Sequence, residues 1–172
     1  KTAKEVYTYT NIAKNPISVV SLAYRRLKEL KMCSNSRILI IGAGETNQNT
    51  TKYLKKHTYT NFAVFNRTLN KAQALATELG GDAYLLSDLE TFNKGFDVII
   101  TCTSASEPIL TNKLYQKLLN GETNLKVIVD LAVPNDVAPD VLENNKVEYI
   151  EVSSFIVFSK LICLKFFFFR II

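Results

Sequence analysis

The sequence predicts an α/β fold, a doubly wound parallel sheet with helices on both faces. Short apolar runs alternate with stretches of helical periodicity, as expected for βαβ units with right-handed crossovers. A glycine turn stands between the first apolar run and the helix after it. The 172 residues are 47% hydrophobic and 22% charged, which suits one ordinary globular domain.

The first predicted elements are a helix and a buried strand. Apolar residues recur at helical spacing from position 17 to position 31, and the far end is basic, which suits a helix C-terminus. RILIIG, residues 37–42, is a continuous apolar run typical of a strand that is buried on both faces. Residues 46–56 predict a second helix, and NFAVFNR, residues 61–67, predicts a second strand.

The same alternation continues to position 152. Residues 69–81 predict a helix that stops at Gly80-Gly81, and residues 83–86 a weak strand followed by an acidic turn or short helix. The remaining predicted elements are a strand at 96–104, a helix at 112–121, a strand at 125–134 and a short strand at 147–152.

Composition shifts divide the chain into three parts. We expect a linker and lead-in helix at 1–34, the sheet domain at 35–152 and an apolar tail at 153–172. The tail carries a cation at every fifth position, which argues against a bilayer span. It is either a buried or partner-covered segment or a stretch read out of frame.

Charge and cysteine usage exclude several classes of site. The net charge of +5 fits an anionic ligand, but the lysines are scattered and form no basic run of the kind that binds nucleic acid. Three widely spaced cysteines without a CxxC argue against a disulfide framework and favour a reducing cytoplasm. A single histidine, His57, argues against a metal site and a Ser-His-Asp triad, and we expect it to be exposed.

The turn Gly42-Ala43-Gly44 follows the first strand and opens a helix. Gly42 allows the tight bend, Gly44 lets the backbone approach a pyrophosphate, and the helix start offers N–H groups to phosphates. Asn47 replaces the third glycine of this pattern, so we expect looser helix packing without loss of phosphate binding. The alternative is a glycine turn that binds nothing.

The end of the second strand indicates which dinucleotide would bind. An NAD site places a carboxylate there for the ribose 2′-hydroxyl, whereas this chain has Asn66-Arg67-Thr68. Arg67 can pair with a 2′-phosphate, and Asn66 and Thr68 can form hydrogen bonds with the same phosphate. The segment therefore favours NADP(H) over NAD(H). Alternatively, Arg67 is a solvated loop residue and Asn66 a turn former.

Two further segments follow strands at the carboxyl edge of the predicted sheet, where ligands of such sheets bind. After the fourth strand come the hydroxyl residues Thr103 and Ser104, although an ordinary turn would look the same. Cys102 is expected to be a small buried hydrophobe rather than a nucleophile. After the fifth strand, the segment beyond Pro134 can lie over a nicotinamide. Asp130 and Asp136, on either side of Pro134, are expected to be turn and cap residues rather than acid or base catalysts.

Four segments together resemble the NADPH-binding, Rossmann-like domain of glutamyl-tRNA reductase. They are IGAGETN, FNRTLNKAQALATELGG, FDVIITCTSASEPIL and VDLAVPNDVAPDV. The earlier NPISVVSLAYRRLKEL is similar to the helix leading into that domain, so the resemblance covers residues 1–152. The chain departs from the family at Asn47, usually glycine, and at Asn135, usually arginine.

The resemblance implies an oxidoreductase that converts glutamyl-tRNA to glutamate-1-semialdehyde, the first committed step of tetrapyrrole synthesis. In that family a cysteine of a separate N-terminal domain forms a thioester, NADPH reduces it, and a C-terminal helical domain makes the dimer. By position, the implied cofactor-binding residues are Gly42, Gly44, Glu45, Asn66, Arg67, Thr68, Thr103, Ser104, Ala132, Val133 and Pro134. None of the three cysteines matches the nucleophile, so this chain is expected to bind NADPH without reducing glutamyl-tRNA alone.

Two other interpretations stay open at this stage. A shikimate-dehydrogenase-like NADP oxidoreductase also has a glycine loop followed by NRT. It would need a substrate domain with a lysine–aspartate pair before the glycine turn, and the residues before that turn leave no room for one. A non-enzymatic binding module with a degraded site is the third interpretation.

Overall fold

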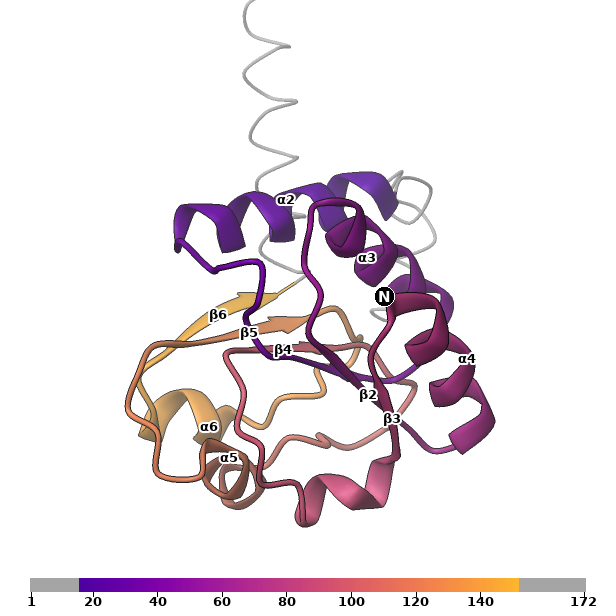
Figure 1. Cartoon of the computed structure of the whole chain (residues 1–172). Coiled ribbons are helices and arrows are strands. Elements are labelled where there is room, and N and C mark those ends of the chain that lie inside the picture. Colours follow the sequence, from indigo (N-terminus) through magenta and orange to yellow (C-terminus); the bar gives the residue numbers. More distant parts are fainter. Residues whose placement is uncertain (1–15, 152–172) are drawn as a thin grey trace, which may run out of the picture.

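Six parallel strands form one sheet at the centre of the protein, in the order β3-β2-β1-β4-β5-β6 (Figure 1). The computed structural model describes residues 16–151, so the predicted linker before Pro16 and the apolar tail at 153–172 lie outside the described residues. The strands are β1 (Ile38–Ile41), β2 (Phe62–Asn66), β3 (Asp82–Leu85), β4 (Val98–Thr101), β5 (Lys126–Asp130) and β6 (Val147–Glu151). The predicted doubly wound α/β fold is confirmed.

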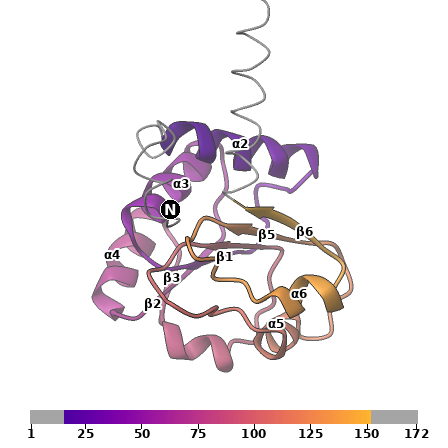
Figure 2. The ribbon, with the colours of Figure 1, turned by 180° about the vertical axis from the view of Figure 1, so that it is seen from behind.

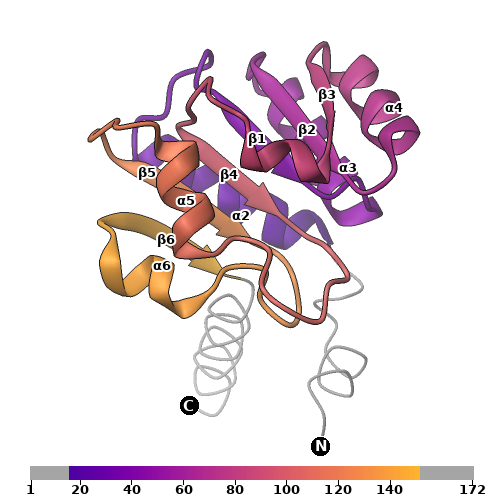
Figure 3. The same ribbon diagram turned by 90° about the horizontal axis from the view of Figure 1, so that it is seen from below.

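Helices cover both faces of the sheet, as the views from behind and from below show (Figures 2 and 3). One face carries α2 (Pro16–Glu29), α3 (Glu45–Lys56) and α4 (Leu69–Leu79). The other carries the 3₁₀ helix η1 (Leu86–Glu90), α5 (Asn112–Leu119) and α6 (Pro139–Asn144). Among residues 16–151, no helix is both long enough and apolar enough to cross a bilayer.

Helix α6 was not predicted from the sequence. It has six residues and begins with Pro139, a residue that suits the first turn of a helix because its missing N–H would have no acceptor there. Only Val141 is buried in it, so its sequence carries no periodicity. The predicted strand at 96–104 was too long, because β4 ends at Thr101 and the apolar run continues into a loop.

Each central strand sends alternate residues into two separate cores. Ile38 and Ile40 of β1 pack beneath α2, α3 and α4, whereas Leu39 and Ile41 pack toward η1, α5 and α6. The period of two in a strand produces this division, and burial on both faces explains the continuous apolar runs in the sequence. Helix α2 shares the first core through Ala23, so the predicted lead-in helix packs on the sheet.

The strand order reverses between β1 and β4, which are adjacent. From β1 the chain winds outward to β2 and β3, and it then returns to β4 and winds the other way to β5 and β6. The helices that follow β1 and β4 therefore lie on opposite faces of the sheet, α3 on one and α5 on the other, and sheets of this type bind ligands at such a reversal point.

An ion-pair network lies at the amino edge of the sheet. The Nη2 atom of Arg37 is 2.7 Å from a carboxylate oxygen of Asp97 and of Glu122. Lys126 is buried; its Nζ donates to the carbonyl oxygen of Phe96 and, at 2.5 Å, to Glu122. Burial opposes ionisation of Asp97, but hydrogen bonds from Arg37 hold its pKa at about 2. Hydrogen bonds from Arg37 likewise lower the pKa of Glu122 to about 2.

Candidate functional site

The first glycine of the turn is required by the fold itself. Gly42 has a φ of +95°, and a Cβ there would lie 2.4 Å from the carbonyl oxygen of Cys102 and 3.2 Å from Cγ2 of Thr103. Its N–H donates to the carbonyl oxygen of Phe65 at 2.8 Å. Because the loop after β4 crosses so close to the turn, any side chain at Gly42 would push the two segments apart.

The second glycine faces open space. Gly44 is the N-cap of α3 with an ordinary φ of −75°, no side chain caps the helix, and no atom lies within 4 Å of where a Cβ would stand. The first N–H groups of an α-helix have no acceptor inside the helix, and they carry a positive end of the helix dipole. An uncapped helix start beside an open space is an arrangement that binds anions such as phosphate.

Asn47 does not loosen the packing of α3, so that expectation was wrong. Its side chain is fully buried, and its Nδ2 donates to the carbonyl oxygens of Ile41 and Gly42, each at 2.8 Å. The amide therefore ties the first turn of α3 to the end of β1. Its Oδ1 has no hydrogen-bond partner within the described part of the chain.

The end of β2 is fastened to the glycine turn by Asn66. Its Oδ1 accepts a hydrogen bond from the N–H of Ala43 at 3.2 Å, and its Nδ2 donates to the carbonyl oxygen of Thr68 at 3.0 Å. Both ends of the amide thus hold backbone, while the side chains of Arg67 and Thr68 are exposed. The predicted contact between Asn66 and a phosphate stays a prediction.

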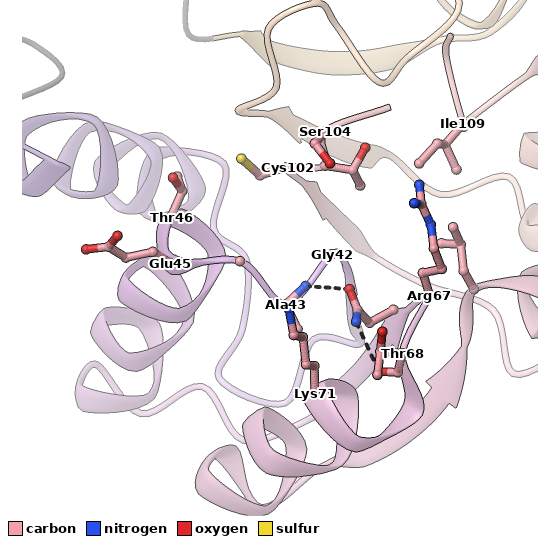
Figure 4. A pocket seen from close by; sticks show the side chains of 14 residues that line it. Gly42, Ala43, Glu45, Thr46, Arg67, Thr68, Lys71, Cys102, Ser104 and Ile109 are labelled. Carbon is pink, nitrogen blue, oxygen red and sulfur yellow. Dashed lines mark hydrogen bonds between the residues drawn. The ribbon is translucent and has the colours of Figure 1, made fainter. Parts of the chain in front are cut away.

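A cavity of about 400 Å³ lies between the glycine turn, the end of β2 and the loop after β4 (Figure 4). It is lined by Gly42, Ala43, Gly44, Glu45, Thr46, Asn66, Arg67, Thr68, Lys71, Leu86, Cys102, Thr103, Ser104 and Ile109. Eight of the eleven predicted site residues are among them. Ala132, Val133 and Pro134 are not, so their predicted place near a nicotinamide stays a prediction.

The two ends of the cavity differ in charge. Figure 4 shows Arg67 beside Ile109 at one end, with Lys71 below the glycine turn, and Glu45 with Thr46 at the other end. Sequence reasoning missed Lys71. The sequence did contain a signal for Lys71. This second cation stands four residues after Arg67, in the first turn of α4.

The loop after β4 is fixed by a buried carboxylate. Asp136 accepts hydrogen bonds from the hydroxyl of Thr101 at 2.6 Å, and from the N–H and the hydroxyl of Thr103 at 2.8 and 2.6 Å. The neighbouring Cys102 is half-buried, and burial raises the pKa of its thiol to about 11. A thiol with so high a pKa is a poor nucleophile, in agreement with its predicted role as a small hydrophobe.

The second aspartate organises the loop after β5. Asp130 accepts hydrogen bonds from the N–H groups of Ala132 at 3.0 Å and Val137 at 3.1 Å, and from the hydroxyl of Tyr149 at 3.2 Å. Burial raises the pKa of its carboxyl. Asp130 thus accepts from the N–H two residues further on, as its predicted turn role requires. The predicted cap role was wrong, because α6 has Ala138 as its N-cap and Asp136 accepts from Thr101 and Thr103 on another loop.

The lone histidine lies away from the cavity. His57 ends α3 and stacks on Tyr24 with a centroid distance of 4.2 Å, so it is half-buried and not exposed as predicted. Residues 16–151 contain no cluster of three or more histidine, cysteine, aspartate or glutamate side chains that could hold a metal ion.

Comparison with known proteins places this site in a family. The shikimate / quinate 5-dehydrogenase family matches residues 21–155. The chain belongs to this family. A glutamyl-tRNA reductase of a Marinomonas species is 35% identical over 148 residues, which are 83% of this chain and 34% of that protein. This member of the shikimate / quinate 5-dehydrogenase family thus spans about a third of the length of the curated relative it matches.

Solved structures agree with this placement. The chain is similar to glutamyl-tRNA reductase from Methanopyrus kandleri, with a TM-score of 0.69 and 27% identity over 80% of this chain and 34% of that one. It also has the fold of the nucleotide-binding domain of glutamyl-tRNA reductase from Thermoplasma volcanium, with a TM-score of 0.55 and 23% identity over 76% of this chain and 84% of that one. The resemblance to the nucleotide-binding domain of glutamyl-tRNA reductase is confirmed.

Proposed function

We propose that this chain is the NADPH-binding domain of a glutamyl-tRNA reductase. The observation that carries the cofactor assignment is the end of β2. Arg67 and Lys71 line the cavity there, at the place where an NAD site would carry a carboxylate for the ribose 2′-hydroxyl. Two cations at this end suit a 2′-phosphate, because guanidinium and ammonium groups both bind phosphate oxygens.

The residues present fit NADPH along the length of the cavity. The uncapped start of α3 and the open space at Gly44 suit the pyrophosphate. Ile109 and Leu86 give apolar surface at the Arg67 end, where an adenine would stack. The loop after β4 closes the side of the cavity that faces the turn. These groups bind and orient the cofactor; none of them has to move a proton.

In this proposal NADPH supplies the hydride that reduces a glutamyl thioester to glutamate-1-semialdehyde, which leads to tetrapyrroles and heme. The thioester forms on a cysteine of another domain, where glutamyl-tRNA also binds, and the full-length enzyme is a dimer. The chain then acts in the cytoplasm, an assignment supported by the free thiols of Cys33 and Cys102. The 35% identity to a glutamyl-tRNA reductase supports this function.

A calorimetric titration of the purified chain with NADPH and with NADH tests the proposal. We expect NADPH to bind much more tightly than NADH, because only NADPH carries the 2′-phosphate. Equal affinities would contradict the assignment of Arg67 and Lys71. If neither cofactor binds, the chain is a non-enzymatic module and the proposal is overturned.

The description of the family itself favours a second candidate, a shikimate- or quinate-type dehydrogenase that uses NADP. The two candidates share the cofactor and differ in substrate. Incubating the chain with NADP⁺ and either shikimate or quinate, while following absorbance of the reduced cofactor, separates them. Turnover of either substrate would favour the dehydrogenase and count against the reductase assignment, whereas NADPH binding without turnover leaves the reductase assignment standing.

A further inference from the structure

Asp136 is a carboxylate buried within reach of the proposed cofactor site that no step of the proposed function uses. It is fully buried, and it does not line the cavity. Its two oxygens accept three hydrogen bonds from Thr101 and Thr103, on the strand and loop that pass the glycine turn.

These bonds decide which way Thr103 faces. A threonine hydroxyl has one proton to donate, and that of Thr103 goes to Asp136. The same oxygen accepts from the N–H of Ala105 at 3.2 Å. The methyl group is turned toward the glycine turn, with Cγ2 3.2 Å from where a Cβ of Gly42 would stand. The carboxylate therefore fixes the orientation of the Thr103 side chain, while the N–H of Cys102 holds the start of the loop by donating to the carbonyl oxygen of Ile41 at 3.0 Å.

The far end of the same loop is held in a different way. The N–H of Leu110 donates to the carbonyl oxygen of Asp136 at 2.9 Å, and the N–H of Ala138 donates to that of Leu110 at 3.0 Å. Both bonds are made by backbone, so a new side chain at Asp136 leaves them in place. Ile109, next to Arg67 at the adenosine end of the cavity, should then keep its position (Figure 4).

We propose that Asp136 is a positioning residue for the cofactor site. Through Thr101 and Thr103 it holds the wall that faces the pyrophosphate and the nicotinamide-side ribose, and it does so without touching the cofactor. This inference rests on the proposed NADPH function. It predicts that loss of the carboxylate weakens binding of the pyrophosphate and nicotinamide half of NADPH, while the adenosine half binds as before.

The test compares two ligands on the same variants by calorimetry. NADPH reaches along the whole cavity, whereas adenosine 2′-monophosphate carries only the adenosine and the 2′-phosphate and has no part of the pyrophosphate. Asp136→Asn keeps the shape but leaves one acceptor oxygen for three donors, so its NADPH affinity should fall about tenfold or more. The affinity for adenosine 2′-monophosphate should change by less than about twofold, which is within the scatter of a neutral substitution.

A second pair of variants covers the possibility that Asp136→Asn fails to fold. Thr101→Val removes one donor to Asp136 from a residue outside the cavity lining, and Thr101→Ser restores the hydroxyl. Thr101→Val should weaken NADPH selectively, and Thr101→Ser should recover most of the loss. Asp97→Asn is the control, because it removes a carboxylate at the other end of β4. It should lower the melting temperature without changing the ratio of the affinities for the two ligands.

Each outcome decides the question. A selective loss of NADPH affinity in Asp136→Asn or Thr101→Val, recovered by Thr101→Ser, supports the positioning role. An equal loss for both ligands, or no loss in any folded variant, overturns it while the proposed function stands. If the unmodified chain binds neither ligand, the proposed function fails first, and the inference fails with it.

Discussion

Replacing Gly44 by valine is expected to abolish tight NADPH binding and leave the fold intact. The backbone at Gly44 has a φ of −75° and a ψ of 170°, which any residue adopts, and the position of its Cβ has no atom within 4 Å. The Cβ therefore meets no atom of a residue beyond its chain neighbours. We expect the melting temperature to move by less than about 4 °C, the shift that about 1 kcal/mol gives in a domain of this size.

The loss of affinity follows from what the valine would fill. Its two methyl groups occupy the space in front of the first turn of α3, so a pyrophosphate is held away from the N–H groups at Gly44 and Glu45. Hydrogen bonds to charged groups contribute about 1.5–3 kcal/mol each, so losing two of them weakens NADPH by about a hundredfold or more. NADH should lose the same factor, because both cofactors carry the pyrophosphate.

Calorimetry and thermal unfolding, run on the same preparations, measure both quantities, and Gly42→Ala is the matched control. There the Cβ would meet the carbonyl oxygen of Cys102 at 2.4 Å and the φ is +95°, so the melting temperature itself should fall. A Gly44→Val protein that melts normally and binds NADPH with unchanged affinity would refute the reasoning, because the helix start would then not hold the phosphates.

Three further predictions concern charge. Arg67→Ala should weaken NADPH by about 1.5–3 kcal/mol and NADH far less, because only the 2′-phosphate loses a charge-assisted partner; equal losses in parallel titrations would count against the assignment. Glu45→Gln should tighten NADPH about two- to fivefold, since a charge at a helix start contributes about 0.3–1 kcal/mol, and raising the salt concentration should erase the gain. Asp97 and Glu122 have pKa values near 2, below their ordinary 3.8 and 4.5, so the stability they add is complete above pH 4.5 and is lost as the pH falls toward 2. Urea unfolding across that range measures the loss, and Arg37→Gln should flatten it; an unchanged slope in that variant would show that the acid sensitivity has another source.

The sequence predicted the sheet well because the strands are buried on both faces. ILII of β1 is buried at all four positions. A continuous apolar run directly before a glycine turn is typical of a parallel strand that is buried on both faces. Helix α6 escaped prediction because a six-residue helix with one buried side chain has no periodic signal. The predicted strands at 96–104 and 125–134 extended beyond the ends of β4 and β5, because their apolar runs continue into loops that are packed over the sheet.

The cavity was predicted in outline, and its internal bonds were not. Residue types and spacing indicated a phosphate-binding turn and a basic β2 end, which depend on local sequence. The bonds from Ala43 to Asn66 and from Thr103 to Asp136 join residues 23 and 33 positions apart, so no local pattern contains them. The bonds of Asn47 are local, but they were missed for another reason: its spacing suggested a missing glycine, whereas its buried amide holds the end of β1.

The site thus separates into residues that build the cavity and residues that are proposed to contact the ligand. Gly42, Asn66 and Asp136 bind other parts of the chain, whereas Gly44 and Arg67 face open space or solvent. Substitutions in the first group change the shape of the cavity, so they act on every ligand that fills the altered region. Substitutions in the second group are expected to act on one chemical group of the ligand, and of the two only Arg67 is predicted to distinguish NADPH from NADH. A position in the glycine loop is therefore not by itself a sign of ligand contact, because Gly42 is required by the close approach of the loop after β4, whereas Gly44 meets no such constraint from the protein.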